Sequence, residues 1–156
     1  MSHQIDARLA ELGIELPETN HPVANYVPYV LSGNLLFLSG QLPQWNGERP
    51  YLGQVGADVT VEDGGKAARL CGLNLIAWIK AATGGDLDRV ARIVKLCGFV
   101  NSSAGFGDQP KVVNGCSDLF VTVFGDTGRH ARSAVGVSSL PFNVAVEIEA
   151  IVELTP

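Results

Sequence analysis

The fold is decided near the end of the chain, by the stretch from Gly128 to Leu154, which reads GRHARSAVGVSSLPFNVAVEIEAIVEL. Its alternation of apolar and polar side chains predicts two strands, Ser133–Ser138 and Val144–Glu153, which a short turn joins into a hairpin. The second strand has two unlike faces. One face carries Val144, Val146, Ile148, Ala150 and Val152, and the other carries Glu147, Glu149 and Glu153.

Arg132 stands at the entrance of the first of these strands, on the same face as Ala134 and Gly136. Small neighbours leave room beside a guanidinium, and the planar fork of an arginine suits a carboxylate held by two parallel hydrogen bonds. A cross-strand salt bridge to Glu147 or Glu149 is the alternative for the same side chain. The pattern therefore indicates either a small carboxylate-binding pocket or an ion pair within the sheet.

After a short N-terminal helix, the rest of the chain predicts a second hairpin, two longer helices and a further strand, so that the order is hairpin, helix, strand, helix, hairpin. The expected ranges are a short helix Ser2–Leu12, strands Val27–Leu31 and Leu35–Ser39, a loop Leu42–Asp58, a helix from the capping pair Thr60 and Asp63 to Ala82, a strand Val90–Val100, and a helix from Pro110 to Gly125. This order indicates an α+β fold, a mixed β-sheet with two helices packed on one face. The other face is expected to carry Arg132, Glu147 and Glu149.

The composition limits the possible classes of function. A chain of 156 residues with 46% apolar residues is expected to form a single domain, 1–156, with 1–24 as an N-terminal extension. The net charge of −5 disfavours a nucleic-acid partner, and no run approaches the roughly 18–20 apolar residues of a membrane span. The first residues lack the features of a signal peptide, which predicts a cytoplasmic protein. The three cysteines, Cys71, Cys97 and Cys116, fit no zinc pattern, so we expect buried thiols and no metal site.

Several short motifs, in the right order from Tyr26 onward, resemble those of the Rid (YjgF-like) family. The closing signature of that family is similar to Arg132-Ser133-Ala134-Val135, then Leu140-Pro141, then Val146-Glu147-Ile148-Glu149-Ala150; its opening is similar to Tyr26 followed by Ser39-Gly40-Gln41-Leu42-Pro43, and its second helix to Val113-Asn114. The resemblance implies a chorismate-mutase-like α+β fold, assembled as a homotrimer with a pocket at each subunit boundary.

The resemblance also implies roles for six residues. Arg132 matches the arginine that holds the substrate carboxylate, and Glu147 matches the glutamate that orients or deprotonates a water molecule. The other matches are to substrate-binding positions of the pocket: Tyr26, Ser39, Asn114 and the main-chain carbonyl of Ala134, which helps to hold the attacking water.

Two positions depart from the family pattern. Ala134 replaces the cysteine of many relatives, which changes the volume and polarity of the pocket but retains the carbonyl. His130 replaces a proline, and it is either a surface histidine or a ligand-facing residue at the mouth of the same pocket. Together with the long N-terminus, these departures resemble a longer branch of the family.

The first functional hypothesis is hydrolysis of small, reactive 2-imino or enamine acids to keto acids and ammonia, without a cofactor. The alternative is a non-catalytic protein that binds small carboxylates or keto acids in the same pocket. The resemblance also suggests a ribonuclease activity. This hypothesis ranks last because the eleven Lys and Arg residues form no basic run.

Overall fold

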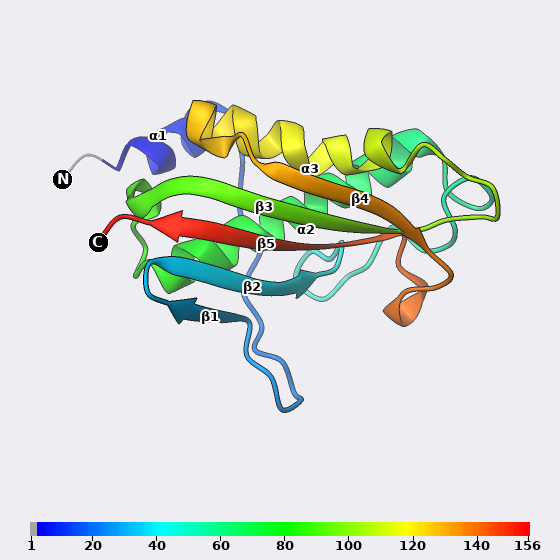
Figure 1. Ribbon diagram of the computed structural model, residues 1–156, viewed down its shortest axis with the longest axis horizontal. Helices are drawn as coiled ribbons and strands as arrows, with labels where there is room; N and C mark the ends of the chain where they lie inside the picture. Colours follow the sequence, from blue (N-terminus) through cyan, green and yellow to red (C-terminus); the bar gives the residue numbers. More distant parts are fainter. Residues whose placement is uncertain (1–2) are drawn as a thin grey trace.

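The arrangement of helices and strands along the chain follows the sequence signals closely. The structure is a computed structural model that describes residues 3–156, and these contain three α-helices and five β-strands (Figure 1). The predicted first helix was expected to start at Ser2, which lies outside the described residues. The elements are α1 Gln4–Glu11, β1 Tyr29–Ser32, β2 Leu35–Gln41, α2 Val61–Ala82, β3 Val90–Asn101, α3 Gln109–Phe124, β4 Ala131–Val137 and β5 Val146–Leu154.

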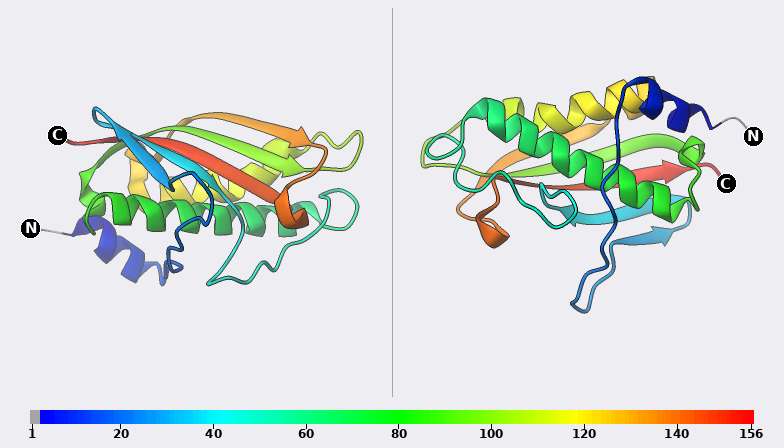
Figure 2. Two further views of the ribbon diagram at one scale, coloured as in Figure 1. Left: turned by 90° about the horizontal axis from the view of Figure 1, so that it is seen from below. Right: turned by 180° about the vertical axis from the view of Figure 1, so that it is seen from behind.

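The five strands form one mixed sheet in the order β1-β2-β5-β3-β4. Only the β3–β4 pair is parallel; the β1–β2, β2–β5 and β3–β5 pairs are antiparallel. Helices α2 and α3 lie side by side on one face of this sheet, as the turned views show (Figure 2). The predicted α+β architecture, with a mixed sheet and two helices on one face, is thus confirmed.

The predicted closing hairpin is wrong, because β4 and β5 do not pair. Strand β4 lies at the edge of the sheet beside β3, and β5 lies between β2 and β3. Helix α3 is the crossover between the two parallel strands β3 and β4, as parallel pairing requires. Residues 138–145 then cross the end of β3 through a 3-10 turn, Pro141–Asn143, and this connection is too long for a tight hairpin.

Helix α3 lies very close to both α2 and β3 because glycines face it. A side chain on Gly115 of α3 would overlap the carbonyl oxygen of Gly65 in α2, and a Cβ on Gly98 of β3 would lie 2.6 Å from Val113. Such close approach fixes the height and rotation of α3 over the sheet. The polar side chains on the outer face of α3 are therefore held at a defined place beside the edge strand β4.

The opposite face of the sheet is not covered by any helix in residues 3–156 (Figure 1). It is partly apolar: Val30, Phe37 and Val135 are 53%, 41% and 45% exposed. A shallow hollow on this face is lined by side chains that include Cys97 and Glu149. Of the three cysteines, Cys71 and Cys116 are buried as predicted, and Cys97 is half-buried on this open face.

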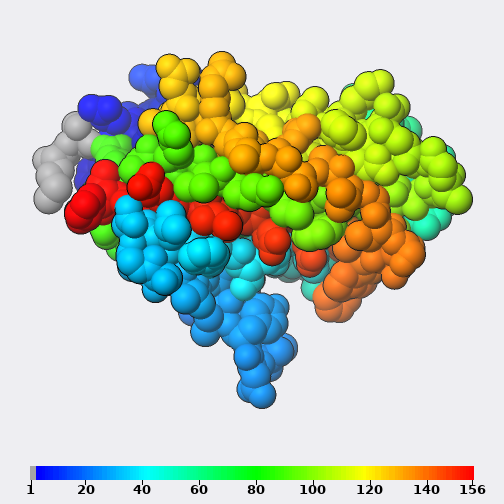
Figure 3. Space-filling view, in the orientation of Figure 1, coloured from blue at the N-terminus to red at the C-terminus, as the bar shows by residue number. Residues whose placement is uncertain are grey.

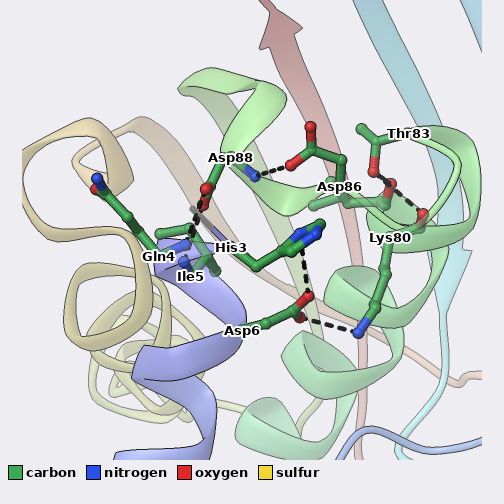
Figure 4. A network of polar contacts seen from close by, with 9 residues as sticks. His3, Gln4, Ile5, Asp6, Lys80, Thr83, Asp86 and Asp88 are labelled. Carbon is green, nitrogen blue, oxygen red and sulfur yellow. Dashed lines mark hydrogen bonds and ion pairs between the residues drawn. The ribbon is translucent and has the colours of Figure 1, made fainter. Parts of the chain in front are cut away.

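The N-terminal helix α1 is fastened to the domain by charged side chains (Figure 4). The carboxylate of Asp88 accepts hydrogen bonds from the backbone N–H groups of Gln4 and Ile5, at 2.8 and 2.9 Å. The Nζ of Lys80, on α2, lies 2.9 Å from a carboxylate oxygen of Asp6. Asp88 thus caps the first N–H groups of α1 from a distant part of the chain.

Candidate functional site

Arg132 lies on the helix-covered face of the sheet, which corrects the prediction that it shares a face with Glu147 and Glu149. In the register of the sheet Arg132 is opposite Leu96, which is fully buried under the helices, whereas Glu147 is opposite Phe99. Residues three apart on a strand face opposite sides, so the two predicted catalytic residues do too. Ala134 and Gly136 share the inward face with Arg132, where their small size leaves room for the side chains around α3. Val135 faces outward.

Three neutral oxygens hold the guanidinium of Arg132. Its Nη1 donates to Oδ1 of Asn114 at 2.8 Å and to Oγ of Ser117 at 3.0 Å, and its Nη2 donates to the carbonyl of Pro110 at 3.4 Å. No carboxylate within residues 3–156 lies within 4.0 Å of it, so the ion pair with Glu147 or Glu149 is absent. The charge is oriented by its neighbours but is not neutralised by them.

Ser117 continues this chain of hydrogen bonds to His130. Its Oγ lies 2.9 Å from Nε2 of His130, and Nδ1 of the same ring lies 2.7 Å from the carbonyl oxygen of Gly128. A carbonyl oxygen only accepts, so Nδ1 carries a proton and Nε2 accepts from the Ser117 hydroxyl. Burial lowers the pKa of His130 and the charge of Arg132 adds to this effect, while the bond to Gly128 opposes it. The lowered pKa favours the neutral ring at neutral pH, and in this form Nε2 accepts from Ser117 and orients its hydroxyl oxygen towards Arg132.

These side chains border a hollow of about 290 Å³ at the β4 edge. Arg132, Asn114, Ser117 and His130 line it, together with Asp118, Val121 and Arg129. His130 lines the same hollow as Arg132, and a ligand-facing role for it stays a prediction. Arg132 and Asn114 are the two predicted site residues that the structure places in direct contact.

Tyr26 lies in a second hollow, of about 360 Å³, beyond the opposite edge of the sheet. It is 58% exposed and belongs to the segment that projects from the body of the molecule before β1 (Figure 3). The backbone of Gly40 and the side chains of Gln41, Arg49 and Phe142 line the same hollow. It contains an aromatic hydroxyl, an amide and a cation within one concave surface.

Glu147 lies against Gly40, one of the residues that line this second hollow. A Cβ built on Gly40 would lie 3.0 Å from Cδ of Glu147, so the carboxyl group packs against the glycine backbone that lines the hollow. Glu147 is half-buried; burial raises the pKa of its carboxyl group, and the charge of Glu149 raises it further. A carboxylate with a raised pKa is a better proton acceptor than an exposed glutamate.

The remaining predicted residues, Ser39 and Ala134, have mainly structural contacts. The hydroxyl of Ser39 donates to the carbonyl of Val27 at 2.6 Å, which fastens the segment that carries Tyr26 to strand β2. Ala134 is opposite Gly98 and its side chain packs against the core, on the same face of β4 as Arg132.

The six predicted residues therefore form two groups at opposite sides of one chain. Tyr26, Ser39 and Glu147 adjoin β2 and the second hollow, whereas Arg132, Asn114 and Ala134 lie at the β4 edge (Figure 1).

Two residues near these hollows were not predicted from the sequence: Ser117, which contacts Arg132, and Arg49, which lines the second hollow. The spacing of Asn114 and Ser117, three residues apart on one helical face, was a usable signal for the first; nothing in the loop around Arg49 pointed to the second.

Across residues 3–156, no group of three or more His, Cys, Asp or Glu side chains is placed to hold a metal ion. No described helix has the length and apolar character that crossing a membrane requires.

Comparisons with known proteins add a family relationship to this geometry. Residues 6–154 match the family profile described as "YjgF/chorismate_mutase-like, putative endoribonuclease". Protein TCP17 of Trypanosoma cruzi is 53% identical over 154 residues, which cover 98% of this chain and 96% of the relative. The 2-iminobutanoate/2-iminopropanoate deaminase of Escherichia coli K12 is 36% identical over 129 residues, which cover 83% of this chain and 87% of the enzyme.

Solved structures agree with the sequence relatives. Atu1372 of Agrobacterium tumefaciens, a protein with unknown function, has a TM-score of 0.91 at 52% identity, covering 97% of this chain and 92% of that one. TdcF of E. coli, crystallised with bound serine, has a TM-score of 0.63 at 27% identity, covering 90% of this chain and 99% of that one. One protein similar to this chain was thus crystallised with a bound amino acid.

Proposed function

Because this chain belongs to the YjgF/RidA (RutC) family, we propose that it hydrolyses small 2-imino and enamine acids to keto acids and ammonia. The observation that carries this proposal is the state of Arg132. Its guanidinium is aimed by Asn114, Ser117 and the Pro110 carbonyl, and no described carboxylate neutralises it. A fixed, unneutralised arginine at the border of a hollow is suited to hold the carboxylate of an imino acid.

The chemistry needs few groups beyond this clamp. The carbon of a protonated C=N bond is already electrophilic, so a positioned water molecule can attack it. In the proposed reaction Glu147 takes one proton from the water as its oxygen bonds to carbon, with the carbonyl of Ala134 as a second support for the water. Glu147 then gives this proton to the nitrogen of the tetrahedral adduct. The C–N bond breaks, the nitrogen leaves as ammonia, and the hydroxyl group passes its proton to Glu147 as the carbon becomes the keto group.

The proposal requires a second copy of the chain. Arg132 borders the hollow at the β4 edge, whereas Glu147 lies against Gly40 of the other hollow and on the other face of the sheet. A neighbour that brings its β4 edge to the hollow of Tyr26 and Glu147 completes the set. The open sheet face, with Val30, Phe37 and Val135 exposed, offers the apolar surface that such an assembly buries. We propose a homotrimer with one pocket at each boundary.

A coupled assay tests the activity. An amino-acid oxidase or a dehydratase generates the imino acid in place, and the release of ammonia is timed with and without this protein. We expect faster release than in buffer alone, and light scattering of the same sample should give the mass of three chains. No acceleration with any of several amino-acid precursors contradicts the hydrolase.

Binding without turnover is the second candidate, because the clamp around Arg132 is complete without Glu147. Isothermal titration with keto acids, beside the coupled assay, separates the two functions. Tight binding with no acceleration identifies a small-carboxylate binding protein, and measurable turnover rejects it.

A further inference from the structure

We propose that Arg49 binds a second acidic group of the substrate, so that the pocket prefers imino acids with two carboxylates. This inference rests on the proposed function, since it assigns a substrate class to the same pocket. Arg49 belongs to the loop between β2 and α2 and lines the hollow that also contains Tyr26 and Gly40. Arg49 is not one of the six residues of the predicted site.

The cation of Arg49 is held in place but is not neutralised. Its guanidinium carbon lies 3.9 Å from the centre of the Phe142 ring, which is a cation–π contact. Its Nε is buried and has no hydrogen-bond partner among the described residues, and no described carboxylate lies within 4.0 Å of the side chain. A buried donor without a partner is costly in a folded protein, which points to a group that supplies the missing acceptor or counter-charge when it binds.

The Phe142 ring that carries Arg49 is itself supported by the backbone. Phe142 has a positive φ of 58°, in a turn closed by hydrogen bonds from Asn143 N to Leu140 O and from Val144 N to Pro141 O. The carbonyl of Asn143 accepts from Gly53 N at 2.8 Å, which ties this turn to the loop that contains Arg49. The cation and its aromatic support are thus joined by main-chain contacts and form a defined wall of the hollow.

The position of this wall relative to Glu147 decides the substrate class. Glu147 lies against Gly40, and Gly40 and Arg49 both line the same hollow of about 360 Å³. If the reacting carbon sits near Glu147 with its own carboxylate on Arg132 of the neighbouring copy, the far end of a short side chain reaches the region of Arg49. A carboxylate at that end, as in the imino acids formed from aspartate or glutamate, meets a cation without a counter-ion.

The test compares two substrate classes in the coupled assay. Imino acids are generated from aspartate and from alanine by oxidases of matching specificity, and kcat/KM is measured for each. We expect the wild-type protein to favour the dicarboxylic substrate and Arg49→Gln to lower the ratio of the two kcat/KM values by about 30-fold. Arg49→Lys should restore part of the ratio. The control is Arg69→Gln, which removes one cation from an exposed position on α2 and should leave the ratio unchanged.

Two results overturn the inference: a wild-type protein with no dicarboxylic preference, or an Arg49→Gln variant that stays folded and keeps the wild-type ratio. The second result leaves Arg49 as a packing partner of Phe142 only. A thermal melt of each variant shows that folding is intact.

If no imino acid is turned over at all, the proposed hydrolase fails, and titration with oxaloacetate and pyruvate still decides the role of Arg49. Oxaloacetate binding that is stronger than pyruvate binding and depends on Arg49 supports it; equal binding, or none, rejects it.

Discussion

The anchor of helix α1 and the arginine of strand β4 use charged side chains in opposite ways. At α1 the charges meet complementary groups: Asp88 accepts two backbone N–H groups, and Lys80 lies 2.9 Å from Asp6 (Figure 4). Arg132 has three hydrogen bonds, but all of its acceptors are neutral oxygens. The charges of the first region hold two parts of the chain together, whereas Arg132 keeps a net positive charge in a fixed orientation.

This difference separates residues that stabilise the fold from residues that await a ligand. A paired group contributes to stability, and its removal leaves a partner unsatisfied. An oriented but unneutralised cation contributes little to stability in the free protein and much to the binding of an anion. Variants in the two regions should therefore affect different measurements.

The largest expected effect is that of Arg132→Ala. Loss of a charge-assisted, two-bond contact should cost about 2–4 kcal/mol of ligand or transition-state binding, or roughly 30- to 1000-fold in kcat/KM. The melting temperature and the oligomer size should change little, because no described carboxylate loses its partner. Turnover, thermal stability and size are measured on one preparation.

Arg132→Lys is the matched variant for this prediction. It keeps the charge but not the planar fork, and it should recover only part of the loss. A destabilised Arg132→Ala protein with normal specific activity would reverse the comparison, since Arg132 would then belong with the structural charges of α1.

Gly40→Ala should have the next largest effect. The new methyl group would lie 3.0 Å from Cδ of Glu147 and would push the carboxyl group out of its place. A shift of this kind should lower kcat by about 10- to 100-fold with little loss of stability, because a flexible side chain can move aside. Gly107→Ala is the control, since a Cβ there meets nothing within 4 Å. Normal kcat in Gly40→Ala would remove Glu147 from the reaction.

Local structure could be predicted from the sequence because its signals act within a few residues. Thr60 accepts a hydrogen bond from Asp63 N at 3.1 Å at the start of α2, as the capping pair predicts, and Gly125 follows the end of α3 at φ 65°. The faces of β5 were also correct, because its strict alternation leaves one arrangement that buries the valines.

Strand pairing could not be predicted in the same way. A hairpin and a crossover can follow the same local pattern, and the choice here depends on how α3 packs on β3 through Gly98 and Val113. The same long-range packing decides that Arg132 faces α3 and not the glutamates. The family motifs identified Arg132 and Asn114 but not their common partner Ser117, because a motif names positions and not the hydrogen bonds between them.

Ser117→Ala tests how much the orientation of the Arg132 guanidinium, apart from its charge, contributes to ligand binding. The hydroxyl connects Arg132 to His130, so its loss leaves the charge in place with one restraint fewer. One hydrogen bond contributes about 1 kcal/mol net, so KM should rise roughly 5-fold while the charge-dependent binding persists. Ser139→Ala, at an exposed position after β4, is the control. A loss as large as that of Arg132→Ala would show that Ser117 has a role of its own.

Glu149→Gln should move the acid limb of the pH–rate profile. Burial raises the pKa of Glu147 first, and the charge of Glu149 raises it second. A base must be deprotonated, so kcat/KM should fall as the pH drops through this raised pKa. Removing the second cause should shift the limb to lower pH, while burial keeps it above the ordinary value of 4.5. Glu153→Gln, on the same strand, should leave the limb in place; an unmoved limb in Glu149→Gln assigns it to a different group.

The smallest expected effect on activity is that of Asp88→Ala, which should leave kcat/KM unchanged while lowering the melting temperature by about 2–4 °C. The hydrogen bond from Ile5 N–H is the largest cause that lowers the pKa of Asp88. Burial opposes it, and the smaller effects of the Gln4 N–H bond and the charge of His3 lower the pKa further. An acid with a lowered pKa in the folded state stabilises the fold above its ordinary value of 3.8, and this stabilisation is lost as the pH falls through the lower, folded-state pKa. The difference in melting temperature between wild type and variant should therefore be full at neutral pH and should shrink in acid below the ordinary value of 3.8.

Asp126→Ala, which removes only an exposed ion pair with Arg129, is the control and should change the melting temperature less. A large loss of turnover in Asp88→Ala, with α1 still folded, would show that the paired charges at α1 also serve the site and would end the separation between the two regions.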